Sequence, residues 1–132
     1  MSQDPDLLFV YGSLLRGQPQ DGLVAAFDAS AATTRGKLYL VPAGYPVLVP
    51  DGEGPEIVGE LLTLDTPGVL RVLDLYEGVD RGLYGRRRID VRCRGRNLRA
   101  WAYVMSEDQV RRRRYRFLEA TDWRRSGLAR RG

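Results

Sequence analysis

Residues 84–105 constrain the fold more than any other stretch, because apolar and polar side chains alternate along them. In the first half, Ile89 and Val91 fall on one face of a strand, while Arg86 and Arg88 fall on the other. The polar residues 95–97 then predict a hairpin turn, after which the alternation resumes. This pattern predicts two antiparallel strands with one buried face, which a helical bundle cannot supply.

Short apolar runs divide the rest of the chain. Further strands are expected at residues 7–11, 37–41, 47–49 (a short edge piece) and 57–64, and helices at residues 19–27, 66–77 and 107–118. In the second helix, Thr66 is the expected N-cap, Pro67 suits the first turn, and Gly78 follows the last. Together these elements predict an α+β fold class with a mostly antiparallel, curved or closed sheet.

The sequence contains no histidine, which excludes histidine-based triads, metal sites and general bases. Acid–base chemistry must therefore use a carboxylate, a tyrosine or a backbone group. The single cysteine, Cys93, excludes a disulfide within the chain, and we interpret it as an inert core residue. No apolar run approaches the ~20 residues that span a bilayer, and the acidic first residues are unlike a signal sequence. We therefore expect a cytoplasmic protein without a membrane partner.

Charge is distributed unevenly along the chain. Residues 1–80 contain 4 basic and 12 acidic side chains, whereas residues 81–132 contain 17 basic and 5 acidic ones. The densest basic run, Arg111 to Arg114 followed by Arg116, is compatible with binding of a nucleic acid or another polyanion. It is equally typical of a solvated helix face, and the acidic half offers a surface for self-association as a homo-oligomer. Because no aromatic RNA-binding motif accompanies the arginines, we favour the second interpretation.

Tyr11, Gly12, Ser13 and Leu14 follow the first buried strand. A glycine-containing loop at a strand end can present backbone N–H groups to a carboxylate or a developing oxyanion, and Gly12 would permit an unusual φ and close approach of a ligand. The alternative is a plain turn. Ser13 is a poor candidate for a nucleophile, because no histidine exists to activate it.

Glu77 ends the predicted helix on the same face as the apolar Leu70 and Leu73. Partial desolvation and the negative end of the helix dipole both raise the pKa of a carboxyl group placed there, as a general base near neutral pH requires. The alternatives are an outward-pointing side chain or an ion pair with a neighbouring arginine (Arg71 or Arg81). Asp74, one turn earlier, is the rival carboxylate.

Four tyrosines lie at predicted strand ends or in loops: Tyr11, Tyr45, Tyr84 and Tyr103. Their hydroxyl groups could orient a polar ligand, or the rings could be ordinary core residues. The sequence alone leaves both readings open for each of them.

The segment Phe9-Val10-Tyr11-Gly12-Ser13-Leu14 resembles the signature loop of the γ-glutamylcyclotransferase-like family. Three further segments match in family order: Gly44-Tyr45-Pro46, Leu73-Asp74-Leu75-Tyr76-Glu77-Gly78 with Tyr84, and Trp101-Ala102-Tyr103-Val104. The matches run from residue 7 to about residue 105. The continuation Leu15-Arg16-Gly17-Gln18-Pro19 is most similar to the short members, which include γ-glutamylamine cyclotransferases and bacterial proteins.

The resemblance implies a small β-barrel with flanking helices and a cavity at one side. Residues 1–105 would form the cyclotransferase-like barrel, and residues 106–132 an Arg-rich helix and tail of the same domain. From the exposed arginines and the narrow apolar strip of this tail, we expect residues 107–132 to be dispensable for chemistry but needed for solubility or assembly. The resemblance also implies a reaction that needs no cofactor or metal. The α-amino group of a γ-glutamyl amide attacks its own γ-carbonyl, which releases 5-oxoproline and an amine or amino acid.

In this interpretation Glu77 is the catalytic base. The substrate-binding residues would be the loop (Tyr11, Gly12, Ser13 and Leu14) together with Tyr45, Tyr84 and Tyr103. Two alternatives remain: a protein of this fold that binds a small molecule without catalysis, and a protein that binds polyanions through the Arg-rich tail.

Overall fold

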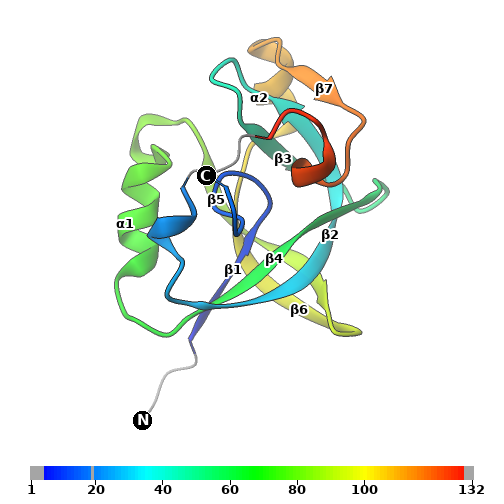
Figure 1. The fold of residues 1–132 in the computed structure, drawn as a ribbon. Helices are drawn as coiled ribbons and strands as arrows, with labels where there is room; N and C mark the ends of the chain where they lie inside the picture. Colours follow the sequence, from blue (N-terminus) through cyan, green and yellow to red (C-terminus); the bar gives the residue numbers. More distant parts are fainter. Residues whose placement is uncertain (1–4, 19, 130–132) are drawn as a thin grey trace.

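Five of seven strands close into a barrel in the computed structural model, which describes residues 5–18 and 20–129 (Figure 1). The strands are β1 (Asp6–Val10), β2 (Asp28–Leu40), β3 (Pro46–Pro50), β4 (Glu56–Leu64), β5 (Gly85–Cys93), β6 (Arg96–Val104) and β7 (Arg116–Leu118). Neighbouring strands follow the order β1-β4-β2-β3-β6-β5, and a parallel bridge between Leu8 and Trp101 joins β1 to β6 and closes the ring of β1, β4, β2, β3 and β6. The expected α+β class with a closed, mostly antiparallel barrel is confirmed.

The hairpin of β5 and β6 forms as the alternating pattern predicts. The strands pair antiparallel from Gly85 opposite Val104 to Cys93 opposite Arg96. The turn is shorter than expected, with two residues, Arg94 (φ 52°) and Gly95 (φ 73°), rather than residues 95–97. Positive φ at both central positions is the backbone of a type I′ turn, whose twist matches that of the paired strands.

Strand β2 is much longer than residues 37–41, because its first half pairs with β4 from Asp28 opposite Thr63 to Arg35 opposite Glu56. This half is small and polar and carries little hydrophobic signal in the sequence. Its second half pairs with β3 and β7. Strand β3 is therefore an interior strand between β2 and β6, not an edge piece, and its side chains from Pro46 to Val49 are buried.

The first two expected helices differ from expectation, the first over its described length and the second at its N-terminal end. In the segment expected as helix 19–27, the described part holds only a 3₁₀ turn, η1 (Asp21–Leu23), and Leu23 is exposed; Pro19 lies outside the described residues. Helix α1 (Val69–Tyr76) begins after Gly68, whose φ is 85°, so Thr66 and Pro67 do not cap it. At its C-terminal end Gly78 adopts φ 69°, as expected for the residue that stops a helix. A second 3₁₀ turn, η2 (Val79–Arg81), follows.

The Arg-rich segment is only partly helical. Helix α2 (Glu107–Arg112) begins with the expected cap, because the Ser106 hydroxyl accepts from the Gln109 N–H in a capping box. It ends six residues before the predicted position at 118, and residues 116–118 instead form β7 against β2. The arginines at 111–114 are exposed, whereas Val110, Leu118 and Trp123 of the 3₁₀ turn η3 (Trp123–Arg125) are buried. This segment therefore contributes side chains to the hydrophobic core.

Candidate active site

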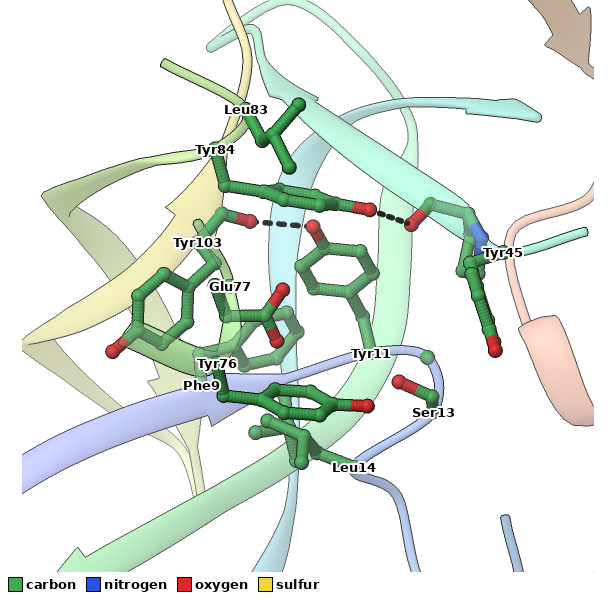
Figure 2. Close-up of a pocket in the computed structure, with 13 residues that line it drawn as sticks. Phe9, Tyr11, Ser13, Leu14, Tyr45, Tyr76, Glu77, Leu83, Tyr84 and Tyr103 are labelled. Atoms are coloured by element: carbon green, nitrogen blue, oxygen red, sulfur yellow. Dashed lines mark hydrogen bonds between the residues drawn. The ribbon is translucent and has the colours of Figure 1, made fainter. Parts of the chain in front are cut away.

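A cavity of about 240 Å³ lies where the loop after β1 meets the C-terminal end of α1 (Figure 2). Every residue proposed from the sequence lines it: Tyr11, Gly12, Ser13, Leu14, Tyr45, Glu77, Tyr84 and Tyr103. The other lining residues are Phe9, Val10, Pro46, Tyr76 and Leu83. The fold thus brings together segments that are more than sixty residues apart in the sequence.

Among the described residues, Glu77 is the one charged residue of the cavity wall. It caps α1 with αR backbone geometry, and its N–H donates to the carbonyl of Leu73 at 2.8 Å. Its carboxylate makes no ion pair or hydrogen bond with any described residue. The alternative of an ion pair between Glu77 and Arg71 or Arg81 is therefore not observed among these residues. Figure 2 shows this carboxylate facing the interior of the cavity beside the Tyr11 ring.

Burial raises the pKa of Glu77 to about 7. No cation among the described residues stands in the cavity wall to oppose this effect. Near neutral pH the group therefore exists in both forms, so it can take a proton and later return it.

Asp74, the rival carboxylate, is fully engaged elsewhere. The Arg86 guanidinium donates to both of its oxygens, with Nε–Oδ1 at 2.7 Å and Nη2–Oδ2 at 3.1 Å. The Tyr103 hydroxyl donates a third hydrogen bond to Oδ1 at 2.8 Å. Asp74 therefore fastens α1, which carries Glu77, to β5 and β6 and is not free to act as a base.

The loop after β1 has three backbone N–H groups without a partner among the described residues. The carbonyls of Gly12 and Ser13 accept from Leu15 and Gln20, but the N–H groups of Gly12, Ser13 and Leu14 donate to no described residue. Unpaired amides in a cavity wall are suitable donors for an anion or a developing oxyanion.

The glycine in this loop does not adopt the unusual φ expected from the sequence, while close approach of a ligand to it stays a prediction. Its φ is not positive, and a Cβ atom at Gly12 would lie 2.7 Å from Cγ of Pro46. The glycine is therefore required for packing of the loop against β3, and an unusual backbone angle is not the reason.

Three of the tyrosine hydroxyls hold the wall together. Tyr11 donates to the carbonyl of Tyr103, and Tyr84 donates to the carbonyl of Pro46 at 3.4 Å, as Figure 2 shows. The Tyr103 hydroxyl points away from the cavity toward Asp74. Burial raises the pKa of all three, which stay neutral. The proton of each hydroxyl is thus donated to the protein, whereas its oxygen can still accept a hydrogen bond, so the role of these tyrosines in substrate binding stays a prediction.

Tyr45 is the exception among the four. The residue is half-buried and its hydroxyl has no hydrogen bond to any described residue, so it remains available to a ligand.

Sequence reasoning does not place Tyr76 and Leu83 in the cavity, although both line it. The position of Tyr76 immediately before Glu77 at the end of α1 suggests the apolar face of the helix, yet its side chain is 42% exposed. Leu83 follows η2, where no periodic pattern predicts an orientation. The adjacency of these two residues to Glu77 and Tyr84 in the sequence is the signal that could identify them.

Asp74→Asn should weaken the attachment of α1. The amide oxygen can still accept from Tyr103, but the charged two-bond contact with Arg86 is lost. Both side chains are about one-quarter exposed, and we expect a loss of about 1–3 kcal/mol in the free energy of unfolding, measured by urea denaturation. Asp90→Asn, which removes the charge from the exposed Arg99–Asp90 pair, is the control and should change stability by less than ~1 kcal/mol. Equal losses in both variants would contradict this role for Asp74.

The sequence matches the family model described as Gamma-glutamyl cyclotransferase, AIG2-like, over residues 8–125. The chain belongs to this family. The match extends through α2, β7 and η3, beyond the residues that carry the resemblance in the sequence alone. No curated protein matches the sequence.

Solved structures share the fold of this family member. YkqA from Bacillus subtilis has a TM-score of 0.69 and 24% identity, and the match covers 90% of this chain and 39% of YkqA. An AIG2-like protein from Mus musculus has a TM-score of 0.63 and 23% identity, with 78% of each chain covered. The uropathogenic E. coli-specific protein c4763 has a TM-score of 0.71 and 16% identity, with 95% of this chain and 97% of c4763 covered. This chain therefore spans well under half the length of YkqA. At these identities the likeness establishes the fold alone.

Proposed function

We propose that this protein is a γ-glutamyl cyclotransferase that uses Glu77 as its general base. The observation that carries the proposal is the pairing of an unpartnered carboxylate, whose pKa is about 7, with a loop of free backbone amides in one cavity. Membership of the AIG2-like cyclotransferase family supports the same reaction.

The proposed reaction needs no protein nucleophile. Glu77 takes a proton from the α-ammonium group of the substrate, and the freed amine attacks the γ-carbonyl carbon to form a new C–N bond. Free N–H groups of the loop at Gly12–Leu14 stabilise the oxyanion that develops. As the oxyanion collapses, the original amide C–N bond breaks, and the departing nitrogen takes this first proton back from Glu77. The ionised Glu77 then accepts the second proton from the new ring nitrogen, which becomes the lactam N–H, and passes it to the amine product or to solvent. The products are 5-oxoproline and a free amine.

The dimensions of the cavity suit this substrate. A volume of about 240 Å³ is large enough to enclose one glutamyl group. Confinement in such a space favours the folded conformation in which the amine approaches its own γ-carbonyl.

The activity test is incubation of the purified protein with γ-glutamyl amines, γ-glutamyl amino acids and glutathione, followed by measurement of 5-oxoproline. Release of 5-oxoproline from at least one compound is the expected result. Stabilisation by these compounds without release would favour a binding protein of the same fold instead. Strong salt dependence of binding to nucleic acid would favour the polyanion alternative.

The rate should rise with pH through about 7 and level off above it, because only the ionised form of Glu77 accepts a proton. The measurement is kcat with saturating substrate between pH 5 and 9. Because kcat describes the enzyme–substrate complex, ionisation of the free substrate does not affect it. A rate that falls as pH rises through 7 would contradict the assignment of Glu77 as the base.

A further inference from the structure

We propose that Arg113 is a positioning residue whose guanidinium fastens the loop at residues 78–83 beside Glu77 and keeps water out of that side of the cavity. The inference deepens the proposed function and rests on it for its kinetic readout. It assigns a role to one member of the exposed arginine run at 111–114, which the proposed reaction does not use.

The loop at residues 78–83 connects two parts of the cavity wall. It follows Glu77 directly and ends before Tyr84, and its own Leu83 also lines the cavity. Among the described residues, the backbone N–H groups of this loop donate only within the loop or back to α1. Local bonds of this kind shape the loop but do not hold it against the barrel.

One hydrogen bond ties the loop to a distant part of the chain. Nη2 of Arg113 donates to the carbonyl of Gly82 at 3.0 Å, across 31 residues of sequence. A charged donor makes a stronger hydrogen bond than a neutral one. Gly82 has φ 71°, and glycine adopts positive and negative φ about equally well, so its own backbone does not fix the direction of the residues that follow. The contact with Arg113 therefore sets where Leu83 lies relative to Glu77.

Arg113 extends from a fixed helix end. Helix α2 is anchored by Val110, which is 0% exposed. The N–H of Arg114 donates to the carbonyl of Arg111 at 3.1 Å and that of Tyr115 to the carbonyl of Val110 at 3.0 Å, the paired bonds of a Schellman motif. Arg114 adopts φ 57°, a strained angle for a residue other than glycine. This turn directs Tyr115 back onto the same core cluster as Val110.

That cluster also supports the cavity. Tyr45 and Tyr84, which line the cavity, pack against it together with Tyr115. Its buried members are Val41, Val47, Val49, Met105 and Val110. The segment from residue 105 to residue 115 therefore supports one side of the wall by packing, and the adjoining loop by the Arg113 hydrogen bond.

The neighbouring arginines of the run have no such contact. Arg111 pairs with Glu107 at 3.4 Å and Arg112 with Asp108 at 3.2 Å, both within α2. Neither reaches beyond its helix in the described part of the chain, whereas Arg113 does. Arg113 does not itself line the cavity, so the role argued for it runs through the loop.

The pKa of Glu77 reports whether the loop is closed. Burial raises this pKa to about 7, and Asp80 and Arg81, the charged residues of the loop, do not line the cavity. The titratable side chains that line it with Glu77 are Tyr11, Tyr45, Tyr76, Tyr84 and Tyr103. Water admitted by an open loop would lower the pKa of Glu77, whereas removal of a nearby positive charge alone would raise it. The sign of the change therefore separates positioning from a simple charge effect.

Three variants of the full chain test the inference: Arg113→Met, Arg113→Lys and Arg112→Met. Methionine keeps an unbranched stem and removes the donor, whereas lysine keeps a charged donor. The measurement is the pKa of the Glu77 carboxyl group by ¹³C NMR titration, with its signal identified by its absence in Glu77→Gln. We expect Arg113→Met to lower this pKa by about 1 from the wild-type value of about 7. Arg113→Lys should retain most of the wild-type value, and Arg112→Met all of it.

The midpoint of the kcat–pH profile should fall by the same amount in Arg113→Met. An unchanged or raised pKa in this variant overturns the positioning role, and so does an equal fall in Arg112→Met. If Arg113→Met fails to fold, Arg113→Gln gives the same comparison. An unchanged pKa with a rise in KM confined to γ-glutamyl amino acids would show that Arg113 contacts the substrate carboxylate directly, which also overturns the positioning role.

The NMR titration contains no substrate, so its result is independent of the proposed reaction. Absence of 5-oxoproline with every γ-glutamyl compound overturns the cyclotransferase function. A lowered pKa in Arg113→Met would still support the contact between Arg113 and the loop, so the two failures are distinguishable.

Discussion

Glu77→Gln should reduce 5-oxoproline formation by a factor of about 10² to 10⁴ while leaving the fold intact. The substitution preserves the size of the side chain and removes its ability to accept a proton. No described residue depends on the carboxylate for a hydrogen bond or ion pair. The measurement is kcat at pH 8 with a γ-glutamyl amide, with Glu53→Gln in an exposed loop as a control that should retain the wild-type rate.

The same variant should be more stable than the wild type at alkaline pH. The pKa of Glu77 rises from 4.5 to about 7 on folding, so the folded protein binds this proton more tightly. Stability contributed by the protonated form is present below pH 4.5 and is lost as pH rises to 7. We therefore expect the stability of Glu77→Gln relative to the wild type to increase by about 2–3 kcal/mol between roughly pH 4 and pH 8.

The activity and the stability of Glu77→Gln, measured together, distinguish a catalytic base from a residue that is needed for the structure. A variant that loses activity and also loses stability at pH 8 would contradict the picture of a buried, unpaired carboxylate retained for function. Wild-type activity in Glu77→Gln would remove the mechanism, since Asp74 is bound by Arg86 and Tyr103.

Trp123→Ala should destabilise the protein by about 3–5 kcal/mol, a large share of the stability of a domain this size. Trp123 is 2% exposed and packs in the main core, although it lies in the tail that the sequence predicts to be dispensable for chemistry. Leu128→Ala, at an exposed apolar position of the same tail, should change stability by less than ~0.5 kcal/mol. Urea denaturation monitored by circular dichroism measures both variants.

Loss of the Trp123 side chain should also disturb the cavity. The Val58 N–H of β4 donates to the carbonyl of Thr121 in the tail, and Arg124 of the tail donates to the carbonyl of Arg16, two residues after the signature loop. We propose that residues 106–129 fold as one unit with the barrel. Truncation after Met105 should therefore yield an unfolded protein, and a folded, active truncation would refute this.

Much of the fold can be read from local patterns. The alternation in residues 84–105 specifies the β5–β6 hairpin, because a strand with one buried face must alternate. Gly78 and Ser106 mark helix boundaries through backbone geometry and capping, which are local interactions. Glu77 is identifiable because a carboxylate at the end of an apolar helix face is expected to be partly buried.

Other features depend on partners far away in the chain. The polar first half of β2 is a strand because β4 supplies its hydrogen bonds, and residues 116–118 leave the helical pattern because β2 offers an edge. Tertiary contacts of this kind override weak local preference. Likewise, the sequence could not show that Arg86 and Tyr103 donate hydrogen bonds to the Asp74 carboxylate, which leaves Glu77 as the free carboxylate.

The sequence by itself determined the β5–β6 hairpin through its periodicity, and the family and eight of the residues around the cavity through the resemblance of its short motifs. Only the tertiary structure decided which groups in that cavity are free to act. The hydroxyls of Tyr11, Tyr84 and Tyr103 are engaged with the protein, whereas Glu77 has no partner among the described residues. The physical reason is that a polar group's availability depends on whether folding gives it a partner, and the partners here come from distant strands.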